Sequence, residues 1–215
     1  MIEGKDSRTR SGVLRYGMVG GASGSFIGDV HRKGAAFDGQ AELVAGCFSS
    51  NYERTVLTGE KLGVDLERLY RDHNEMAEKE AAREDGIDFV IIATPNYAHY
   101  AAAKAFLLQG IHVVCDKPLT FTVEEAEELE RLAAEQGLLF GVTYVYSQCP
   151  TVKQAKLMVE RGDIGEIQVV VAEYPQGWLA TAVEHEDNKQ AAWRTDPKQA
   201  GISNCVGDIG SHIEN

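Results

Sequence analysis

The chain has 215 residues, of which 44% are hydrophobic and 25% are charged, as is typical of a globular protein with a sizeable core. Its formal net charge of -12 argues against nucleic acid or an anionic membrane surface as the main partner. No apolar run reaches the roughly 18 residues that a membrane span needs. The N-terminus is polar and lacks the apolar region of a secretory signal, so residues 1–11 are expected to be disordered.

The cysteines lie far apart and show no C-x-x-C spacing. Cys47 and Cys115 fall in apolar, strand-like runs, where a thiol is more often a small buried hydrophobic group than a metal ligand or half of a disulfide. We therefore expect free thiols and a reducing, cytoplasmic location.

An apolar run at residues 13–19 leads into a cluster of small residues and then into a helix-like pattern. Small residues let the backbone approach a pyrophosphate, and the N-terminus of the following helix supplies N–H groups and partial positive charge. The cluster departs from strict G-x-G-x-x-G, and alone it leaves a phosphate cradle and an ordinary tight turn equally open. The candidate cofactor-binding residues here are Gly20, Gly21, Ala22, Ser23, Gly24, Ser25, Phe26 and Ile27.

A second strand is predicted at residues 41–48, followed by a helix that contains Arg54. In dinucleotide-binding folds, an Asp or Glu at the end of this strand accepts from the 2′-hydroxyl of NAD. Here the position carries Ser49 and Ser50, which together with Arg54 would tolerate the 2′-phosphate of NADP. The alternative is that Ser50 or Asn51 caps the helix and the arginine is solvated.

Helices and strands then alternate: a helix at residues 72–83, a buried strand at 87–93, a helix at 97–109, a strand at 111–115, a helix from Thr122 to a closing Gly137, and a strand at 138–142. Short connections of this kind predict parallel strands in a Rossmann-type, doubly wound α/β sheet. Ligands of such sheets bind beyond the carboxyl ends of the strands. The ends of the two later strands add Thr94, Pro95, Asn96, Asp116, Lys117 and Pro118 to the candidate cofactor site, with His99 a short helical step further on.

Beyond residue 150 the pattern changes. A helix is predicted at residues 152–161 and a partly alternating strand at 167–174, as in an open antiparallel sheet covered on one face. We therefore expect a dinucleotide-binding domain at residues 1–147 and part of a second α/β domain at 148–215.

Three residues are candidates for catalysis. Lys117 at a strand end would orient a substrate hydroxyl, whereas a solvated surface charge is the alternative. Asp208 and His212 lie one turn apart if their segment is helical, which suits removal of a hydroxyl proton, whereas a capping Asp and a structural His are the alternatives. No third ligand at a usual spacing supports a metal site.

Trp193 and Arg194 are candidates to form the wall of a sugar-sized pocket. The alternative is that Trp193 packs in the core and Arg194 is solvated.

In combination, these motifs resemble the Gfo/Idh/MocA oxidoreductases over essentially the whole chain from about residue 13. The matching motifs are the glycine-rich turn, Thr94-Pro95-Asn96-x-x-His99, Asp116-Lys117-Pro118 in place of the family's E-K-P, and Asp208-x-Gly210-x-His212. The resemblance implies a nicotinamide-binding Rossmann domain and a second domain with a mostly antiparallel sheet that serves substrate binding and homo-oligomer contacts. It implies hydride transfer between NAD or NADP and a secondary alcohol of a sugar, anhydrosugar or cyclitol. In this scheme His212 is the acid/base, Lys117 and Asp208 hold the oxygen, and Trp193 and Arg194 join these three in binding the substrate.

The chain departs from the family pattern in three ways: the missing strand-end carboxylate, Ser147 where many members carry an arginine, and a length that covers only part of the second domain. An incomplete sheet leaves apolar surface wet, so we expect weak or no turnover from this chain alone. The rival hypotheses are a non-catalytic dinucleotide-binding or sensor protein on the same fold and a purely structural scaffold.

Overall fold

The computed structural model describes residues 12–175, 177, 180, 181, 183, 188–201 and 210. The chain divides into two compact units, Met1–Thr94 with Ala98–Val142, and Pro95–Tyr97 with Thr143–Asn215. Among the described residues, every helix is too short or too polar to cross a lipid bilayer.

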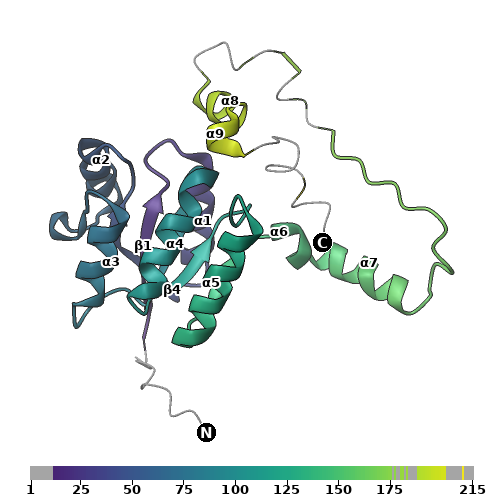
Figure 1. Ribbon diagram of the computed structural model, residues 1–215, viewed down its shortest axis with the longest axis horizontal. Coiled ribbons are helices and arrows are strands. Elements are labelled where there is room, and N and C mark those ends of the chain that lie inside the picture. Colours follow the sequence, from purple (N-terminus) through teal and green to yellow (C-terminus); the bar gives the residue numbers. More distant parts are fainter. Residues whose placement is uncertain are drawn as a thin grey trace, which may run out of the picture. The chain divides into compact units, whose positions relative to one another are not determined.

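The first unit is built on one sheet of five parallel strands in the order β2-β1-β3-β4-β5. Figure 1 labels β1 and β4 of this sheet. From β1 the chain first adds β2 on one side and then returns to add β3, β4 and β5 on the other. This reversal between β1 and β3 is the doubly wound topology that the sequence predicts. The strands are β1 (Leu14–Gly20), β2 (Ala41–Cys47), β3 (Phe89–Ala93), β4 (His112–Cys115) and β5 (Phe140–Val142).

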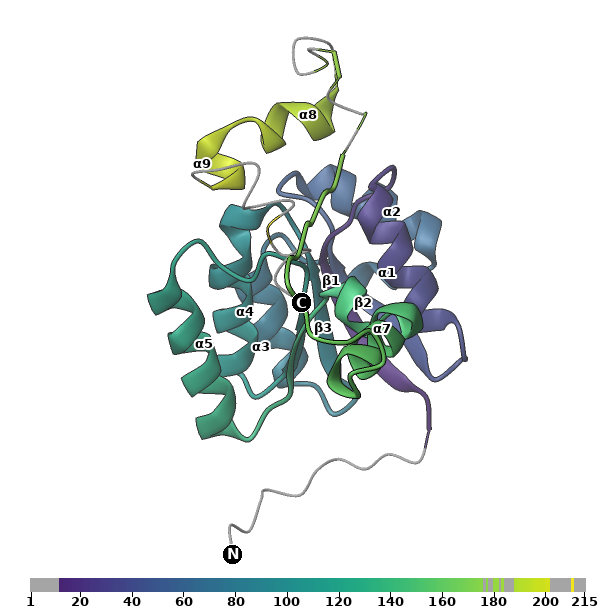
Figure 2. The ribbon, with the colours of Figure 1, turned by 90° about the vertical axis from the view of Figure 1, so that its right-hand side faces the viewer.

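Helices cover both faces of this sheet, with α1 on one side and α3, α4 and α5 on the other (Figure 2). Alternate residues of β3 therefore enter different cores: Val90 and Ile92 pack on the side of α4 and α5, and Ile91 on the side of Met18. This explains why β3 is a continuous apolar run. The helices are α1 (Phe26–Ala36), α2 (Tyr52–Leu62), α3 (His73–Ala81), α4 (His99–Leu108) and α5 (Val123–Gln136), with short 3-10 turns at Leu66–Arg68 and Asn96–Ala98.

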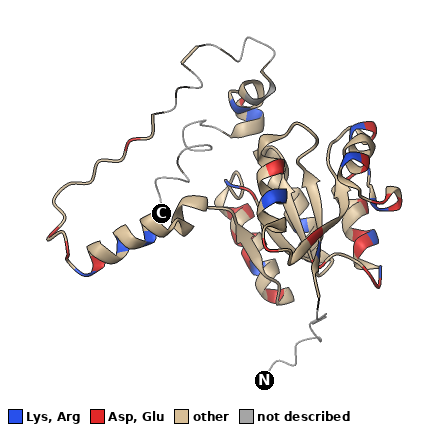
Figure 3. Cartoon of the chain, turned by 180° about the vertical axis from the view of Figure 1, so that it is seen from behind, with Lys and Arg blue, Asp and Glu red and all other residues tan. Residues whose placement is uncertain are grey.

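Charged residues lie mainly on the helices and turns, while the strands contain few of them (Figure 3). Arg68 is a charged residue that is buried. Its Nε donates to Glu80 Oε1 at 3.0 Å, and Tyr70 Oη donates to the same oxygen at 2.6 Å. All three side chains are buried. The Arg68–Glu80 pair therefore fixes the connection between α2 and α3 to α3, because separating two buried charges is costly.

Local sequence signals set the helix ends as predicted. Asn51 Oδ1 accepts from the N–H of Arg54 at 3.0 Å, and Thr122 Oγ1 accepts from the N–H of Glu125 at 3.2 Å. Gly137 closes α5 in the left-handed conformation, with φ of 64°. Asn51 rather than Ser50 is therefore the cap of α2.

Glycines allow the turn after β1 to pack against its neighbours. A Cβ on Gly28 would lie 2.6 Å from Cα and 2.8 Å from the carbonyl oxygen of Gly21, so this first-turn residue of α1 packs backbone to backbone on the turn. A Cβ on Gly20 would lie 2.5 Å from the carbonyl oxygen of Ala93, and Gly20 has φ of 80°. Gly28 therefore takes the place of the last glycine of the dinucleotide-binding pattern, at the end of a longer turn than G-x-G-x-x-G allows.

The second unit contains α6 (Val145–Gln148), α7 (Pro150–Glu160), α8 (Lys189–Arg194) and α9 (Pro197–Ala200). Asn96 Nδ2 donates to the carbonyl oxygen of Ala200 at 3.1 Å and so fixes α9 within this unit. Residues 167–174, predicted as a strand, form no strand here, and Val169, Val170 and Val171 are 76–80% exposed. The reason is that a strand needs a paired neighbour, and the described part of this unit supplies none. The antiparallel sheet stays a prediction.

We predict that Gly28→Ala destabilises the first unit by about 1–3 kcal/mol, because the added methyl meets backbone atoms that cannot rotate away. Gly34→Ala is the matched control on the same helix, since a Cβ there has nothing within 4 Å. The control is expected to be neutral or to stabilise by up to about 1 kcal/mol. Urea unfolding of both variants measures the difference, and equal free energies of unfolding would contradict the proposed packing.

Candidate functional site

Most of the predicted cofactor-binding residues lie at one edge of the sheet. Because all five strands are parallel, the residues that follow β1, β2, β3 and β4 lie at the same edge. We call this the ligand edge; it consists of residues 20–25, 49–50, 94 and 116–118. Phe26 and Ile27 open α1, Arg54 lies in the first turn of α2, and Pro95 and Asn96 belong to the second unit.

The start of α1 faces this edge with unpaired backbone N–H groups. Ser25 Oγ accepts from the N–H of Gly28 at 3.2 Å and so caps the helix. In the described part of the chain, no hydrogen bond is donated by the backbone N–H of Phe26 or Ile27. Free N–H groups and the positive end of a helix dipole together make a site for a phosphate group.

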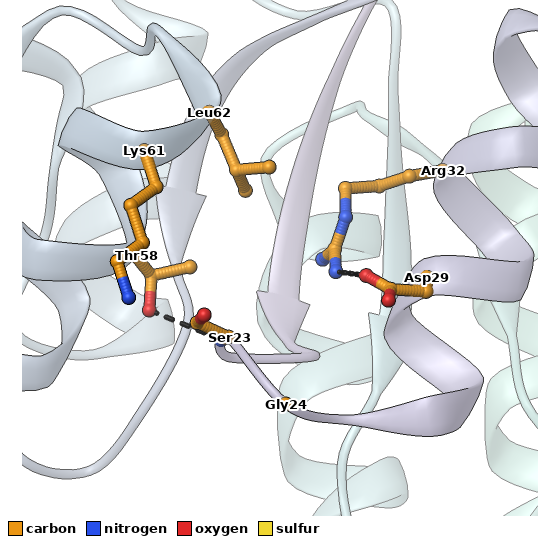
Figure 4. Close-up of a pocket in the computed structure, with 7 residues that line it drawn as sticks. All are labelled: Ser23, Gly24, Asp29, Arg32, Thr58, Lys61 and Leu62. Atoms are coloured by element: carbon orange, nitrogen blue, oxygen red, sulfur yellow. Dashed lines mark hydrogen bonds and ion pairs between the residues drawn. The ribbon is translucent and has the colours of Figure 1, made fainter.

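Two side chains that the sequence analysis did not identify hold the glycine-rich turn in place (Figure 4). Arg32 Nη1 donates to the carbonyl oxygen of Gly21 at 2.7 Å, and its guanidinium forms an ion pair with Asp29. On the other side, the N–H of Ser23 donates to Thr58 Oγ1 at 3.2 Å. A polar pocket of about 90 Å³ lies between these contacts, too small for a nucleotide. No periodicity or motif in the sequence identified Arg32 and Thr58, because each contacts a residue that is distant from it in the sequence.

The end of β2 is occupied by a local hydrogen-bond network. The N–H of Ser49 donates to Thr55 Oγ1, and this hydroxyl donates to the carbonyl oxygen of Ser49, both at 3.1 Å. Ser49 Oγ accepts from the N–H of Asn51 at 3.2 Å. Arg54 is exposed on the first turn of α2. No carboxylate takes the position at which NAD-binding folds usually hold the ribose 2′-hydroxyl.

His99 joins the turn after β3 to the turn after β4. Its side chain is fully buried, and Nδ1 lies 2.7 Å from the carbonyl oxygen of Pro118, while Nε2 lies 3.0 Å from that of Thr94. Both ring nitrogens are thus directed at protein carbonyls. The arrangement ties the end of β3 to the turn that carries Lys117.

The Asp-Lys-Pro turn follows β4 and is held to its neighbours. The N–H of Asp116 donates to the carbonyl oxygen of Ile92 at 2.9 Å, and Asp116 Oδ1 accepts from the N–H of Lys117 at 2.9 Å. His31 of α1 lies beside the same carboxylate, with Nε2 at 4.0 Å from Oδ1. Burial lowers the pKa of His31 below its ordinary value of 6.5, although the Asp116 carboxylate raises it in part. His31 was a further site residue that sequence reasoning passed over.

Two buried polar atoms at this edge have no hydrogen-bond partner among the described residues: Thr94 Oγ1 and His31 Nε2. Leaving such an atom unpaired costs about 1–3 kcal/mol, and the folded first unit bears this cost at both atoms. The free N–H groups of α1, at the end of the glycine-rich turn, fit the phosphate groups of a dinucleotide.

The remaining predicted residues lie either outside the described residues or in the second unit. Asp208 and His212 lie outside the described residues. Trp193 and Arg194 lie on α8 in the second unit, where the guanidinium carbon is 4.6 Å from the indole centroid. Within the described ranges, no group of three His, Cys, Asp or Glu side chains gathers as metal ligands do.

A doubly wound parallel sheet with a glycine-rich turn before a helix, and a lysine turn two strands away, defines a Rossmann-type dinucleotide-binding domain. The model of the oxidoreductase family with an NAD-binding Rossmann fold matches residues 14–144, and that of the Gfo/Idh/MocA C-terminal domain matches residues 152–215. The chain belongs to the Gfo/Idh/MocA oxidoreductase family.

Individual relatives agree with this assignment. The uncharacterized oxidoreductase YfiI of Bacillus subtilis is 43% identical over 213 residues, 99% of this chain and 54% of the relative. An inositol dehydrogenase homologue of Azotobacter vinelandii was solved with NAD⁺ (42% identity, TM-score 0.90, 96% of this chain and 53% of that one) and with NADH and myo-inositol (40%, 0.86, 95% and 51%). Levoglucosan dehydrogenase with NADH and levoglucosan is 28% identical, with TM-score 0.74 over 94% of this chain and 52% of that one. The chain spans about half the length of these relatives.

We predict that the free energy of unfolding falls as the pH is lowered below about 6.5, where histidines protonate in the unfolded chain. Burial lowers the pKa of both His31 and His73, so in this window the unfolded chain binds protons that the folded chain does not. His31→Met and His73→Gln should each flatten the slope between pH 5 and 6.5. Urea titrations at several pH values measure it, and an unchanged slope in both variants would contradict the assignment.

Proposed function

We propose that the protein is an NAD(P)-dependent dehydrogenase that transfers a hydride between the nicotinamide ring and a secondary alcohol of a sugar, anhydrosugar or cyclitol. The observation that carries the proposal is the linkage of three turns at the ligand edge. The turn after β1 packs on Ala93, His99 joins Thr94 to Pro118, and Asp116 is bonded to β3. An extended dinucleotide needs such a continuous edge, because it crosses several strand ends.

Two relatives support the substrate class, since one was solved in complex with NADH and myo-inositol and the other in complex with NADH and levoglucosan. Both are ring compounds that carry several secondary hydroxyl groups. A site for them needs polar side chains that hold one hydroxyl in place while the ring is oriented. Trp193 and Arg194 stack on each other, and we propose that they form one wall of the substrate pocket.

When bound, the nicotinamide supplies the hydride acceptor or donor. Lys117, half-buried after β4, is proposed to direct its ammonium group at the reacting oxygen and so to stabilise negative charge there. His212 is proposed to take the hydroxyl proton as general base, while Asp208 helps Lys117 to hold the reacting oxygen. Contacts between copies of the protein through the second-domain sheet are part of the same proposal.

We predict that Lys117→Ala lowers kcat about 100- to 1000-fold in a version with a complete second domain, because one charge-stabilising donor is lost. NADH absorbance with a panel of cyclitols, sugars and anhydrosugars measures turnover. Lys33→Ala is the control, since Lys33 is exposed in the last turn of α1. Turnover that survives both Lys117→Ala and His212→Ala would contradict these roles. NADH binding without turnover of any compound would favour a non-catalytic sensor.

For cofactor choice, we propose that NADP is accepted as well as NAD, with Arg54 meeting the 2′-phosphate. The support is the absence of a carboxylate after β2 and the exposed position of Arg54. Arg54→Ala is expected to weaken NADPH binding about tenfold or more while leaving NADH binding nearly unchanged, because a charge-assisted contact is lost. Fluorescence titration of both cofactors measures this, and equal losses would show that the arginine does not read the 2′ position.

A further inference from the structure

Asn96 is a buried polar residue that joins two distant parts of the sequence. It is 7% exposed, and its Nδ2 donates to the carbonyl oxygen of Ala200 at 3.1 Å. Ala200 is itself buried and ends α9. The last carbonyl groups of a helix have no partner within the helix, so a buried one needs a donor from elsewhere. Among the described residues, the Asn96 amide is the group that meets this need.

The helices α8 and α9 are closely joined to each other. Thr195, in the two-residue connection between them, donates from Oγ1 to the carbonyl oxygen of Ala191 at 2.9 Å. Asp196 caps α9, since its Oδ1 accepts from the N–H of Lys198 at 3.0 Å. These contacts fix the connection at both of its residues. A bond that holds the end of α9 therefore also restrains α8.

The other end of the Asn96 contact lies close to the ligand edge along the chain. Asn96 opens the short 3-10 turn Asn96–Ala98, two residues after Thr94. At the far end of this turn, His99 Nε2 lies 3.0 Å from the carbonyl oxygen of Thr94. The turn is thus tied back to the strand end from which it starts. It provides a fixed base for the helix that Asn96 holds.

We propose that Asn96 is a positioning residue for the substrate. Its amide holds the α8–α9 pair, which carries Trp193 and Arg194, to the turn that follows β3. The wall that these two residues form is then kept in register with the edge at which the nicotinamide is expected. This role differs from the cofactor contact that the sequence predicts for Asn96, because the amide nitrogen is used by the protein. The inference rests on the proposed function, since the wall has a role only where a sugar or cyclitol is bound.

Removing the amide donor is expected to release α9 in the full chain. Asn96→Leu keeps the approximate size of the side chain but cannot donate, and Asn96→Asp keeps its shape while placing an acceptor against the carbonyl oxygen of Ala200. The aspartate variant decides the matter if leucine disturbs the fold. Cleavage of a transiently opened segment follows the population of its open form. Trypsin is therefore expected to cut after Arg194 and Lys198 about tenfold faster in both variants, as measured by mass spectrometry.

Two further measurements separate positioning from other roles. Affinity of the full chain for NADH, from isothermal titration calorimetry, is expected to stay within about twofold of the parent in both variants. In a version with a complete second domain, KM for the compound turned over best in a panel of cyclitols, sugars and anhydrosugars is expected to rise about five- to tenfold, while KM for the cofactor is unchanged. Asn74→Leu, the same replacement at an exposed position of α3, is the control and should change none of these values.

Each other outcome overturns the inference. Unchanged cleavage after Arg194 and Lys198 means that the Asn96 contact does not hold α9. Weaker NADH binding without faster cleavage means that Asn96 meets the cofactor instead. Faster cleavage with unchanged KM for every compound means that the contact is only structural. If the complete version turns over no compound although the variants are cut faster, the proposed function fails, the anchoring of α9 stands, and the role toward substrate falls.

Discussion

The ligand edge depends on two places where backbone touches backbone. Gly28 of α1 packs on Gly21, and Gly20 packs on the carbonyl oxygen of Ala93. Any side chain at Gly20 or Gly28 would separate the turn from the helix or from β3. Close packing here brings the N-terminus of α1 over the strand ends, so the helix dipole is directed at the edge where an anionic ligand is expected.

Three side-chain contacts then hold the turns of the ligand edge in place. Arg32 returns from α1 to the carbonyl oxygen of Gly21, Thr58 receives the N–H of Ser23, and His99 bridges the turns after β3 and β4. Each contact joins elements that are distant in the sequence. The turns are therefore ordered before a ligand arrives, which lowers the entropy that binding must overcome.

Signals that act over a few residues were readable from the sequence. The buried strand at β3, the caps at Asn51 and Thr122, and the shared edge of Lys117 with the glycine-rich turn all follow from local patterns and from the parallel topology. The role of Gly28 was hidden, because the longer turn shifts it out of the usual spacing. Arg32, Thr58 and His31 were missed because only the folded chain shows what they face. The strand at residues 167–174 did not form, since strands depend on partners elsewhere.

The exposed segment at residues 167–174 has a practical consequence. Val169, Val170 and Val171 are consecutive and 76–80% exposed, and no strand lies beside them in the part of the chain that the structure describes. Bare edges of this kind template pairing between molecules, and a net charge of -12 opposes such pairing only at low ionic strength. Added salt is therefore expected to favour association through these eight residues, and Val170→Lys to oppose it by placing a charge on the unpaired segment.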